Sequence, residues 1–194
     1  MRPCHKDLDH SFDETYKEKE EMFGHPYKEL QDYFNNYPIK GSVLDLGCGQ
    51  GRDSLFLASL GYNVTAIDNS KTGIKQMLKK ADEQEIKLIG IVANVLKFKH
   101  EEKYDVILFD MLLHSFKKQQ QEKLLRKYSN SLNKRGIICI VFPDDLKIDH
   151  FMSMIRSLPG DWKLLDEIII NDVPKIEEED SDYTFVMMVV QSKS

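Results

Sequence analysis

The segment Val43-Leu44-Asp45-Leu46-Gly47-Cys48-Gly49-Gln50-Gly51-Arg52-Asp53-Ser54 decides how the rest of the chain is interpreted. Residues 43–46 predict a short apolar strand that carries Asp45, and a glycine-rich turn follows it. The turn opens a helix predicted over Leu55–Leu60. Because Gly47 and Gly49 have no side chains, the turn can adopt positive φ and let a ligand approach the main chain closely. The N-terminus of the following helix offers unpaired N–H groups and a partial positive charge, so this turn is a candidate ligand site.

The spacing of the glycines differs from that of the dinucleotide-binding fingerprint, Gly-x-Gly-x-x-Gly. Here a glycine comes one residue early, at Gly51, and Arg52 takes the place of the third glycine. This departure argues against a nicotinamide dehydrogenase. The simpler alternative to a ligand site is that the glycines only form a tight turn. A second strand is predicted over Asn63–Ile67, with Asp68 at its end. A carboxylate about twenty residues beyond a glycine turn, at the tip of the second strand, is placed to bind both hydroxyls of a ribose.

The segment Asp45-Leu46-Gly47-Cys48-Gly49-Gln50-Gly51, followed by Asp68, resembles the cofactor signature of class I S-adenosylmethionine-dependent methyltransferases. The continuation Gly51-Arg52-Asp53-Ser54-Leu55-Phe56-Leu57-Ala58 resembles the tellurite-resistance and thiopurine-type small-molecule methyltransferases. The likeness covers residues 40–142. It implies that the chain binds S-adenosylmethionine and transfers the methyl group, by in-line displacement and without a metal ion, to a small-molecule acceptor.

The resemblance assigns the cofactor contacts to the glycine turn and to the strand ends. Gly47, Cys48 and Gly49 would pass beneath the amino-acid part of the cofactor, and Asp45 would orient its ammonium group. Asp68 would hold the ribose, Asn69 would flank the adenine, and Asn94 with Val95 would contact the adenine edge. The full set of predicted cofactor residues is Asp45, Gly47, Cys48, Gly49, Gly51, Arg52, Asp68, Asn69, Asn94, Val95, Asp110, Met111 and Tyr16.

Several of these positions have structural alternatives. Many family members carry an acidic residue where Asn94 stands, and an Asx-turn after the strand is the other interpretation of this asparagine. Arg52 could anchor the start of the helix, which we favour, or reach an anionic substrate. No histidine is visibly placed to activate Cys48, so we do not expect this thiol to act as a nucleophile.

The N-terminal region covers the bound cofactor in the resembling family. Tyr16, Phe23 and Tyr27 are therefore candidate lid residues, and aromatic faces favour a sulfonium cation. The alternative is that these aromatic side chains belong to the core. A helix is predicted to begin near Pro26 and to end at Tyr37, before Pro38.

Strands alternate with helices along most of the chain, which predicts an α/β fold. Further strands are predicted over residues 86–92, 104–109, 137–142, 162–170 and 183–190, and helices after Ser70 and over residues 116–132 and 148–158. Residues 96–103 are too short and polar a connection for a full helix. We expect a doubly wound, mostly parallel, seven-stranded Rossmann-like sheet with one antiparallel strand in a C-terminal hairpin. A single domain is predicted over residues 1–194, with a cap at 1–40, a cofactor-binding core at 41–142 and the C-terminal part at 143–194.

Ligands bind at the carboxyl ends of the strands in open α/β sheets, so the residues after the fourth strand should line the crevice between cofactor and acceptor. These residues are Asp110, Met111, Leu112, Leu113 and His114. His114 is the one candidate catalytic residue, because it could take a proton from a neutral nucleophile. A hydrogen-bonded structural histidine is the alternative.

Two polar segments receive a simpler interpretation. Cys4, His5 and His10 lack a second ligand pair at zinc-finger spacing, so we expect a frayed terminus. The loop before the last strand carries Glu177-Glu178-Glu179-Asp180, which we expect to be solvated. The tellurite-resistance branch has a histidine–arginine pair near the reaction centre in this loop, and its absence here argues against a chalcogen substrate.

Composition excludes several classes of protein. A net charge of −5 argues against general binding of nucleic acid. No apolar run approaches the length of a membrane span, and the first residues lack the apolar core of a secretory signal. Three scattered cysteines form no disulfide framework, which indicates a reducing compartment, and we expect the cytoplasm.

Three functions remain open from the residues. The first is a small-molecule methyltransferase, whose acceptor atom could be oxygen, nitrogen, sulfur or a metalloid. The second is a methyltransferase that acts on protein or RNA, although no Asn-Pro-Pro-Tyr-type segment follows the fourth strand. The third is a module that binds S-adenosylmethionine without turnover.

Overall fold

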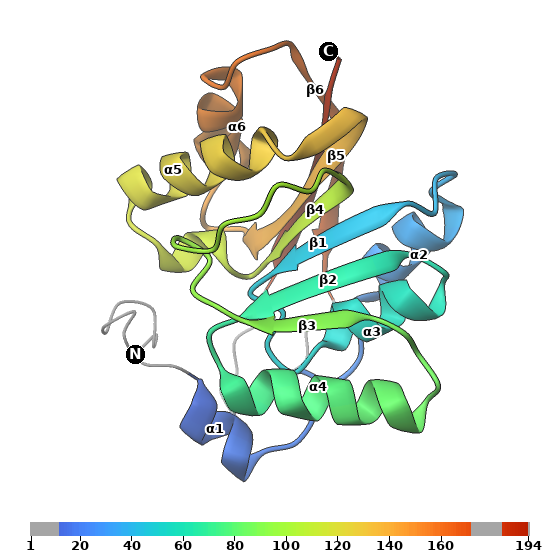
Figure 1. Cartoon of the computed structure of the whole chain (residues 1–194). Coiled ribbons are helices and arrows are strands. Elements are labelled where there is room, and N and C mark those ends of the chain that lie inside the picture. The colour runs from blue at the N-terminus through green and yellow to red at the C-terminus, as the bar shows by residue number, and fades with distance from the viewer. Residues whose placement is uncertain (1–11, 172–183, 194) are drawn as a thin grey trace.

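The computed structural model describes residues 12–171 and 184–193. Seven strands form one sheet in the order β3-β2-β1-β4-β5-β7-β6 (Figure 1). The strands are β1 Ser42–Leu46, β2 Asn63–Asp68, β3 Ile89–Val92, β4 Tyr104–Asp110, β5 Leu132–Pro143, β6 Trp162–Ile170 and β7 Phe185–Ser192. The helices are α1 Asp13–Glu18, α2 Lys28–Asn36, α3 Arg52–Ser59, α4 Lys71–Glu83, α5 Lys118–Ser129 and α6 Ile148–Arg156, together with the 3₁₀ helix η1 Leu113–Ser115.

All neighbouring strands pair in parallel except β7, which runs antiparallel to both β5 and β6. The prediction of a doubly wound, mostly parallel sheet with one antiparallel strand in a C-terminal hairpin is therefore confirmed. Successive residues of a strand point to opposite faces, so the sheet builds two apolar cores. The core on one face includes residues of α2, α3 and α4, and the core on the other face includes residues of α5 and α6.

The central strands are apolar on both faces because each face is covered. In β4, Val106 and Leu108 belong to the core under α3, whereas Ile107 and Phe109 belong to the core under α5. All four side chains are fully buried. The sequence of this strand is consequently a continuous apolar run, and it was recognisable as a strand for that reason.

Several elements differ from the predicted ones; α3, for example, begins at Arg52 rather than Leu55. β3 begins at Ile89 rather than Ile86, because the Ile86 N–H donates to the Ala81 carbonyl (2.8 Å) and closes the end of α4. β5 begins at Leu132, which pairs with Tyr104 across a register shift, so the predicted helix over residues 116–132 ends earlier, at Ser129. The short polar helix α1 was not predicted at all.

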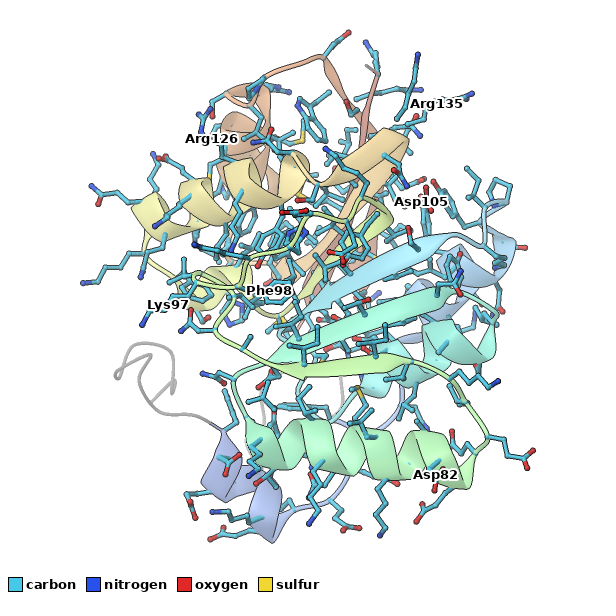
Figure 2. All side chains as sticks on the ribbon, in the orientation of Figure 1. Asp82, Lys97, Phe98, Asp105, Arg126 and Arg135 are labelled. Atoms are coloured by element: carbon cyan, nitrogen blue, oxygen red, sulfur yellow. The ribbon has the colours of Figure 1, made fainter. Side chains whose placement is uncertain are left out.

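Residues 93–103 connect β3 to β4 without a helix, as their short polar sequence predicts. Figure 2 labels Lys97 and Phe98 in this connection. At the start of β4, the carboxylate of Asp105 accepts the Ser42 N–H (2.7 Å) and joins the first residues of β1 and β4. Among the described residues, no helix has the length and apolar character needed to cross a membrane.

The strand order places β2 and β4 on either side of β1. β2 and β4 both pair with β1 in parallel, so the end of β2, the glycine turn after β1 and the end of β4 meet at one edge of the sheet. Asp68 and Asp110 are the last residues of β2 and β4. This edge is where the sequence predicts the cofactor.

Candidate functional site

The glycine turn adopts the conformation for which its sequence is suited. Gly47, Gly49 and Gly51 have φ values of 77°, 53° and 82°, in the left-handed region that residues with a side chain rarely adopt. The Gly47 and Cys48 N–H groups both donate to the Ile67 carbonyl, at 2.8 and 3.1 Å. These bonds attach the turn to the end of β2, so the turn and Asp68 form one unit.

Both carboxylate oxygens of Asp68 accept main-chain N–H groups, one from the glycine turn and one from the residue before α4. Its Oδ2 accepts the Gly49 N–H (2.9 Å) and its Oδ1 accepts the Ser70 N–H (2.7 Å), and the residue is 9% exposed. Burial raises the pKa of Asp68. A carboxylate has about four acceptor positions, so two hydrogen bonds leave capacity for the hydroxyl groups of a ligand. The Ser70 hydroxyl also accepts the Gly73 N–H (2.9 Å), so Ser70 is the N-cap of α4, the helix predicted after it.

A buried charged cluster lies under the start of α3. Arg52 pairs with Asp53 through two hydrogen bonds (3.0 and 2.9 Å) and contacts Asp110 through the same guanidinium. Asp45 is 2% exposed and accepts the Ser54 hydroxyl (2.5 Å). Burial and the neighbouring Asp53 raise the pKa of Asp45 to about 7. The one guanidinium therefore pairs with two of the three buried carboxyl groups, Asp53 and Asp110.

Asp110 has the least complete hydrogen bonding in this cluster. Burial raises its pKa well above the ordinary value, although Arg52 opposes the shift. Its Oδ1 is buried and has no hydrogen-bond partner among the described residues. The cluster consequently favours a positively charged ligand nearby and disfavours an anionic one.

The two predicted lid tyrosines are both buried. Tyr16, in α1, is 3% exposed, and a Cβ added to Gly49 would lie 2.6 Å from its hydroxyl oxygen. Its ring therefore covers the glycine turn. Tyr27 is 5% exposed, stacks on the Arg52 guanidinium (4.1 Å from the ring centroid) and contacts Phe185 edge-to-face. Tyr27 belongs to the core under α3, so this side chain is part of the core, as the alternative interpretation expects.

The residues after β4 divide between the site and the core. A Cβ at Gly47 would lie 2.7 Å from Leu112, so that side chain lies against the glycine turn. Met111 has a φ of 46°, which is unusual for a residue with a long side chain. The prediction that Leu113 lines the crevice is wrong, because the residue is fully buried in the core under α5. His114 is half-buried in η1.

Gln121, which the sequence did not single out, holds this turn in place. It is 4% exposed and donates from Nε2 to the carbonyls of Leu113 (2.9 Å) and Phe116 (3.0 Å). Since the amide nitrogen serves two carbonyls, Oε1 is the acceptor and His150 donates to it from Nε2 (2.8 Å). A glutamine in a polar helical stretch gives no signal of such a role.

The two residues predicted to contact the adenine edge already make hydrogen bonds within the protein. Asn94 is exposed, and its Oδ1 accepts the Leu96 N–H (3.0 Å), which is the Asx-turn given as the alternative. Val95 is buried, and its carbonyl accepts the Tyr128 hydroxyl (2.7 Å) and Lys127 Nζ (2.9 Å). Asn94 can therefore offer its NH₂ group, and Val95 its N–H, whereas Asn94 Oδ1 and the Val95 carbonyl already accept hydrogen bonds within the protein. Asn69 is exposed beside Asp68.

Two further expectations concern sulfur and metal chemistry. Burial raises the pKa of the Cys48 thiol well above its ordinary value, so a thiolate nucleophile is disfavoured. Among residues 12–171 and 184–193, no group of three histidine, cysteine or acidic side chains could hold a metal ion. Cys4, His5 and His10 and the acidic run 177–180 lie outside the described residues.

Comparison with known proteins places this geometry in a family. The family model for the tellurite resistance protein TehB matches residues 13–150. A probable S-adenosyl-L-methionine-dependent methyltransferase TehB from Haemophilus influenzae is 28% identical over 165 residues, which cover 72% of this chain and 58% of that protein. The chain spans about half the length of the curated relatives it matches, at 46% and 58%.

Solved structures agree with the fold. A structure described for the conversion of a disulfide bond into a thioacetal group during echinomycin biosynthesis has a TM-score of 0.76 and 22% identity, with 93% of this chain and 90% of that one covered. The N-methyltransferase NodS from Bradyrhizobium japonicum, in complex with S-adenosyl-L-homocysteine, has a TM-score of 0.72 and 12% identity, covering 95% and 100%. At these identities the likeness establishes the Rossmann-like fold.

Proposed function

The chain belongs to the tellurite resistance protein TehB family, and we propose that it binds S-adenosylmethionine and transfers the methyl group to a small-molecule acceptor. The observation that carries the proposal is Asp68, a buried carboxylate at the end of β2 that is hydrogen-bonded to Gly49 of the glycine turn. This pairing supports a role for Asp68 in binding ribose hydroxyls, because Gly49 beside it has no side chain to obstruct a ligand. When bound, S-adenosylmethionine supplies an electrophilic methyl group on a sulfonium centre.

The charge of the site supports this cofactor over a dinucleotide. S-Adenosylmethionine carries an ammonium, a sulfonium and one carboxylate, so its net charge is positive, whereas the pyrophosphate of NAD is negative. The cluster holds three carboxyl groups, Asp45, Asp53 and Asp110, and a single guanidinium, Arg52, which already pairs with Asp53 and Asp110. A cationic ligand near Asp45 would lower the cost of its buried charge, and an anionic ligand would increase that cost.

The chain's own residues would act mainly by positioning. Asp45 would orient the ammonium group, directly or through water, and Asp68 would bind the ribose. Cys48 would line the turn without reacting, and Asn69 would flank the adenine, whose edge Asn94 and Val95 would contact through N–H donors. Tyr16 would cover the ligand above Gly49. Holding the reactants in line and excluding water can contribute roughly 7–11 kcal/mol in favourable cases.

The acceptor is expected at the edge formed by the turn after β4. Met111 and Leu112 give this edge an apolar surface, and His114 in the same turn is the candidate base for an acceptor that must lose a proton. The solved structures named above are an N-methyltransferase and a protein described for echinomycin biosynthesis, and their names do not select the acceptor atom for this chain.

The test is a methyl-transfer assay that detects S-adenosylhomocysteine across acceptors grouped by atom: thiols, phenols, amines and the oxyanions of selenium and tellurium. Purified protein and total RNA serve as further acceptors. We expect turnover with at least one small-molecule group and its loss in Asp68→Ala, while Asp82→Ala, on the outer surface of α4 (Figure 2), keeps full activity. Turnover with RNA or protein alone would contradict the acceptor class. Tight binding without turnover on any acceptor would indicate a non-catalytic module.

A further inference from the structure

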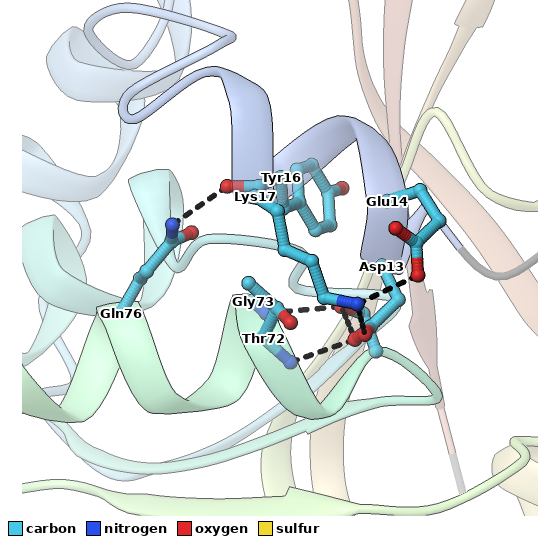
Figure 3. Close-up of polar contacts among 8 residues, drawn as sticks. Asp13, Glu14, Tyr16, Lys17, Thr72, Gly73 and Gln76 are labelled. Carbon is cyan, nitrogen blue, oxygen red and sulfur yellow. Dashed lines mark hydrogen bonds and ion pairs between the residues drawn. The ribbon is translucent and has the colours of Figure 1, made fainter.

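The segment over residues 12–24, here called the strap, is fastened across the glycine turn by one carboxylate. Asp13, at the start of α1, accepts the Thr72 N–H (2.7 Å) and the Ser70 hydroxyl (2.8 Å) from the first turn of α4 (Figure 3). The first N–H groups of a helix have no partner within that helix. Asp13 therefore caps α4 from another helix, where its negative charge also meets the positive end of the helix dipole.

Two glutamines and an ion pair add to the attachment of the strap, and the ion pair joins Glu21 of the strap to Lys80 of α4 (2.6 Å). Gln76 of α4 donates to the Tyr16 carbonyl (2.7 Å), as Figure 3 shows. Gln50 of the glycine turn donates to the Lys19 carbonyl (2.7 Å) and accepts the Met22 N–H (2.8 Å). The strap is thus bonded to both elements that border the proposed cofactor site.

Polar contacts hold the strap, with little help from apolar burial. Tyr16 is the one buried residue of the described strap, and most of the others are exposed. Phe12, Tyr16 and Phe23 pack mainly on one another, at centroid distances of 5.6 to 6.5 Å. A segment with few buried apolar contacts opens at low cost in free energy, because its hydrogen bonds can be replaced by bonds to water.

The attachment point of the strap is also part of the cofactor site. Ser70 donates its hydroxyl to Asp13 and its N–H to Asp68, so a single residue joins the strap to the carboxylate proposed to bind ribose. Tyr16 covers Gly49, whose N–H donates to the same Asp68 carboxylate. A ligand bound at the edge formed by the glycine turn and Asp68 would lie beneath the strap and could leave only after the strap had moved.

We propose that Asp13 is the latch of this strap, and that the cofactor and its product enter and leave only when the contacts of Asp13 with Ser70 and Thr72 break. Asp13 is in this view a positioning residue that controls exchange and touches no reacting atom. The inference rests on the proposed function, since it assumes a ligand at Asp68. The closure of the strap itself does not depend on any ligand.

The first measurement needs no ligand and tests the latch alone. Hydrogen exchange of the Thr72 amide and of the strap amides is compared in the unmodified protein, in Asp13→Ala and in Lys17→Ala. Lys17 is the matched control, because it lies on the same helix and pairs with Asp13 and Glu14 without an ion pair to α4. Exchange should be about fivefold faster in Asp13→Ala, the factor expected from loss of a helix cap, and unchanged in Lys17→Ala. Equal exchange in all three proteins would overturn the latch.

The second measurement tests the gate, by surface plasmon resonance with S-adenosylhomocysteine over the immobilised protein. A gate predicts that both the association and the dissociation rate constants increase about fivefold in Asp13→Ala, with a smaller change in Kd. A faster dissociation with an unchanged association rate would mean that the strap is only a wall of the site, and would overturn the gate. No binding by any of the proteins, together with a latch intact by hydrogen exchange, would instead refute the proposed cofactor.

Discussion

Replacing Asp45 by asparagine should change how the stability of the ligand-free protein depends on pH. The Asp45 carboxyl is buried, and its pKa is raised to about 7 by burial and by Asp53. An unfolded chain titrates this group near its ordinary value of 3.8. Between these values the native state holds one proton more than the unfolded chain, so stability falls as the pH rises through this window.

The size of the effect follows from the shift of the pKa. A shift from 3.8 to about 7 corresponds to about 4 kcal/mol in total, of which about 3 kcal/mol is lost between pH 5 and pH 8. Asparagine has no such titration and can still accept the Ser54 hydroxyl. Relative to the unmodified protein, Asp45→Asn should therefore gain about 3 kcal/mol of unfolding free energy when the pH is raised from 5 to 8.

The assay is urea unfolding at pH 5, 6, 7 and 8, followed by circular dichroism and compared at equal m-values. Asp82→Asn, on the exposed surface of α4, is the control for a carboxyl group whose removal should leave the pH dependence unchanged. A difference between Asp45→Asn and the unmodified protein that stays constant across this pH range would refute the argument, because it would mean that Asp45 titrates alike in both states.

Three further predictions concern the turn, the crevice and the thiol. By urea unfolding, Gly51→Ala should lower the unfolding free energy by about 3 kcal/mol or more, and Gly61→Ala by about 1 kcal/mol. Both glycines have a left-handed φ, but only at Gly51 would a Cβ crowd a side chain, that of Met77 at 2.1 Å. Equal losses of stability would contradict this account. Gln121→Leu should cost about 2–3 kcal/mol, because the buried Leu113 carbonyl and the part-buried Phe116 carbonyl lose their donor, and should lower kcat more than cofactor affinity; an unchanged kcat would remove its role in positioning the turn. Cys48→Ala should keep cofactor binding by calorimetry and turnover in the transfer assay, because burial keeps the thiol protonated; lost activity at unchanged affinity would restore a chemical role for this residue.

The fold was accessible from the sequence because its strands are apolar runs ended by glycine or acidic residues. Residues 43–60 predicted β1, the glycine turn and a helix that begins three residues earlier than expected, at Arg52, and the adjacency of the last two strands indicated the antiparallel hairpin. Errors arose where a local pattern was ambiguous. Leu113 lies in an apolar run that continues past the end of β4, and only the packing of η1 against the core decides that its side chain points inward.

The contacts that organise the site were not accessible, because they join residues far apart in the chain. Asp13 meets Thr72, and Arg52 meets Asp110, through side chains that carry no local signature of their partner. Gln121 was equally invisible, since a polar residue on a helix is ordinarily solvated. The sequence therefore predicts which residues surround the turn better than it predicts how the strap and the post-β4 turn are held.

The most direct test of the central claim is calorimetric titration of the protein with S-adenosylmethionine and, separately, with NAD, with Asp68→Ala as the paired variant. Asp68 accepts the Gly49 N–H beside the glycine turn and is the residue proposed to hold the ribose. We expect micromolar binding of S-adenosylmethionine, its loss in Asp68→Ala, and no binding of NAD. An absence of S-adenosylmethionine binding by the folded, unmodified protein would contradict the account, and the glycine turn would then be only a connection between β1 and α3.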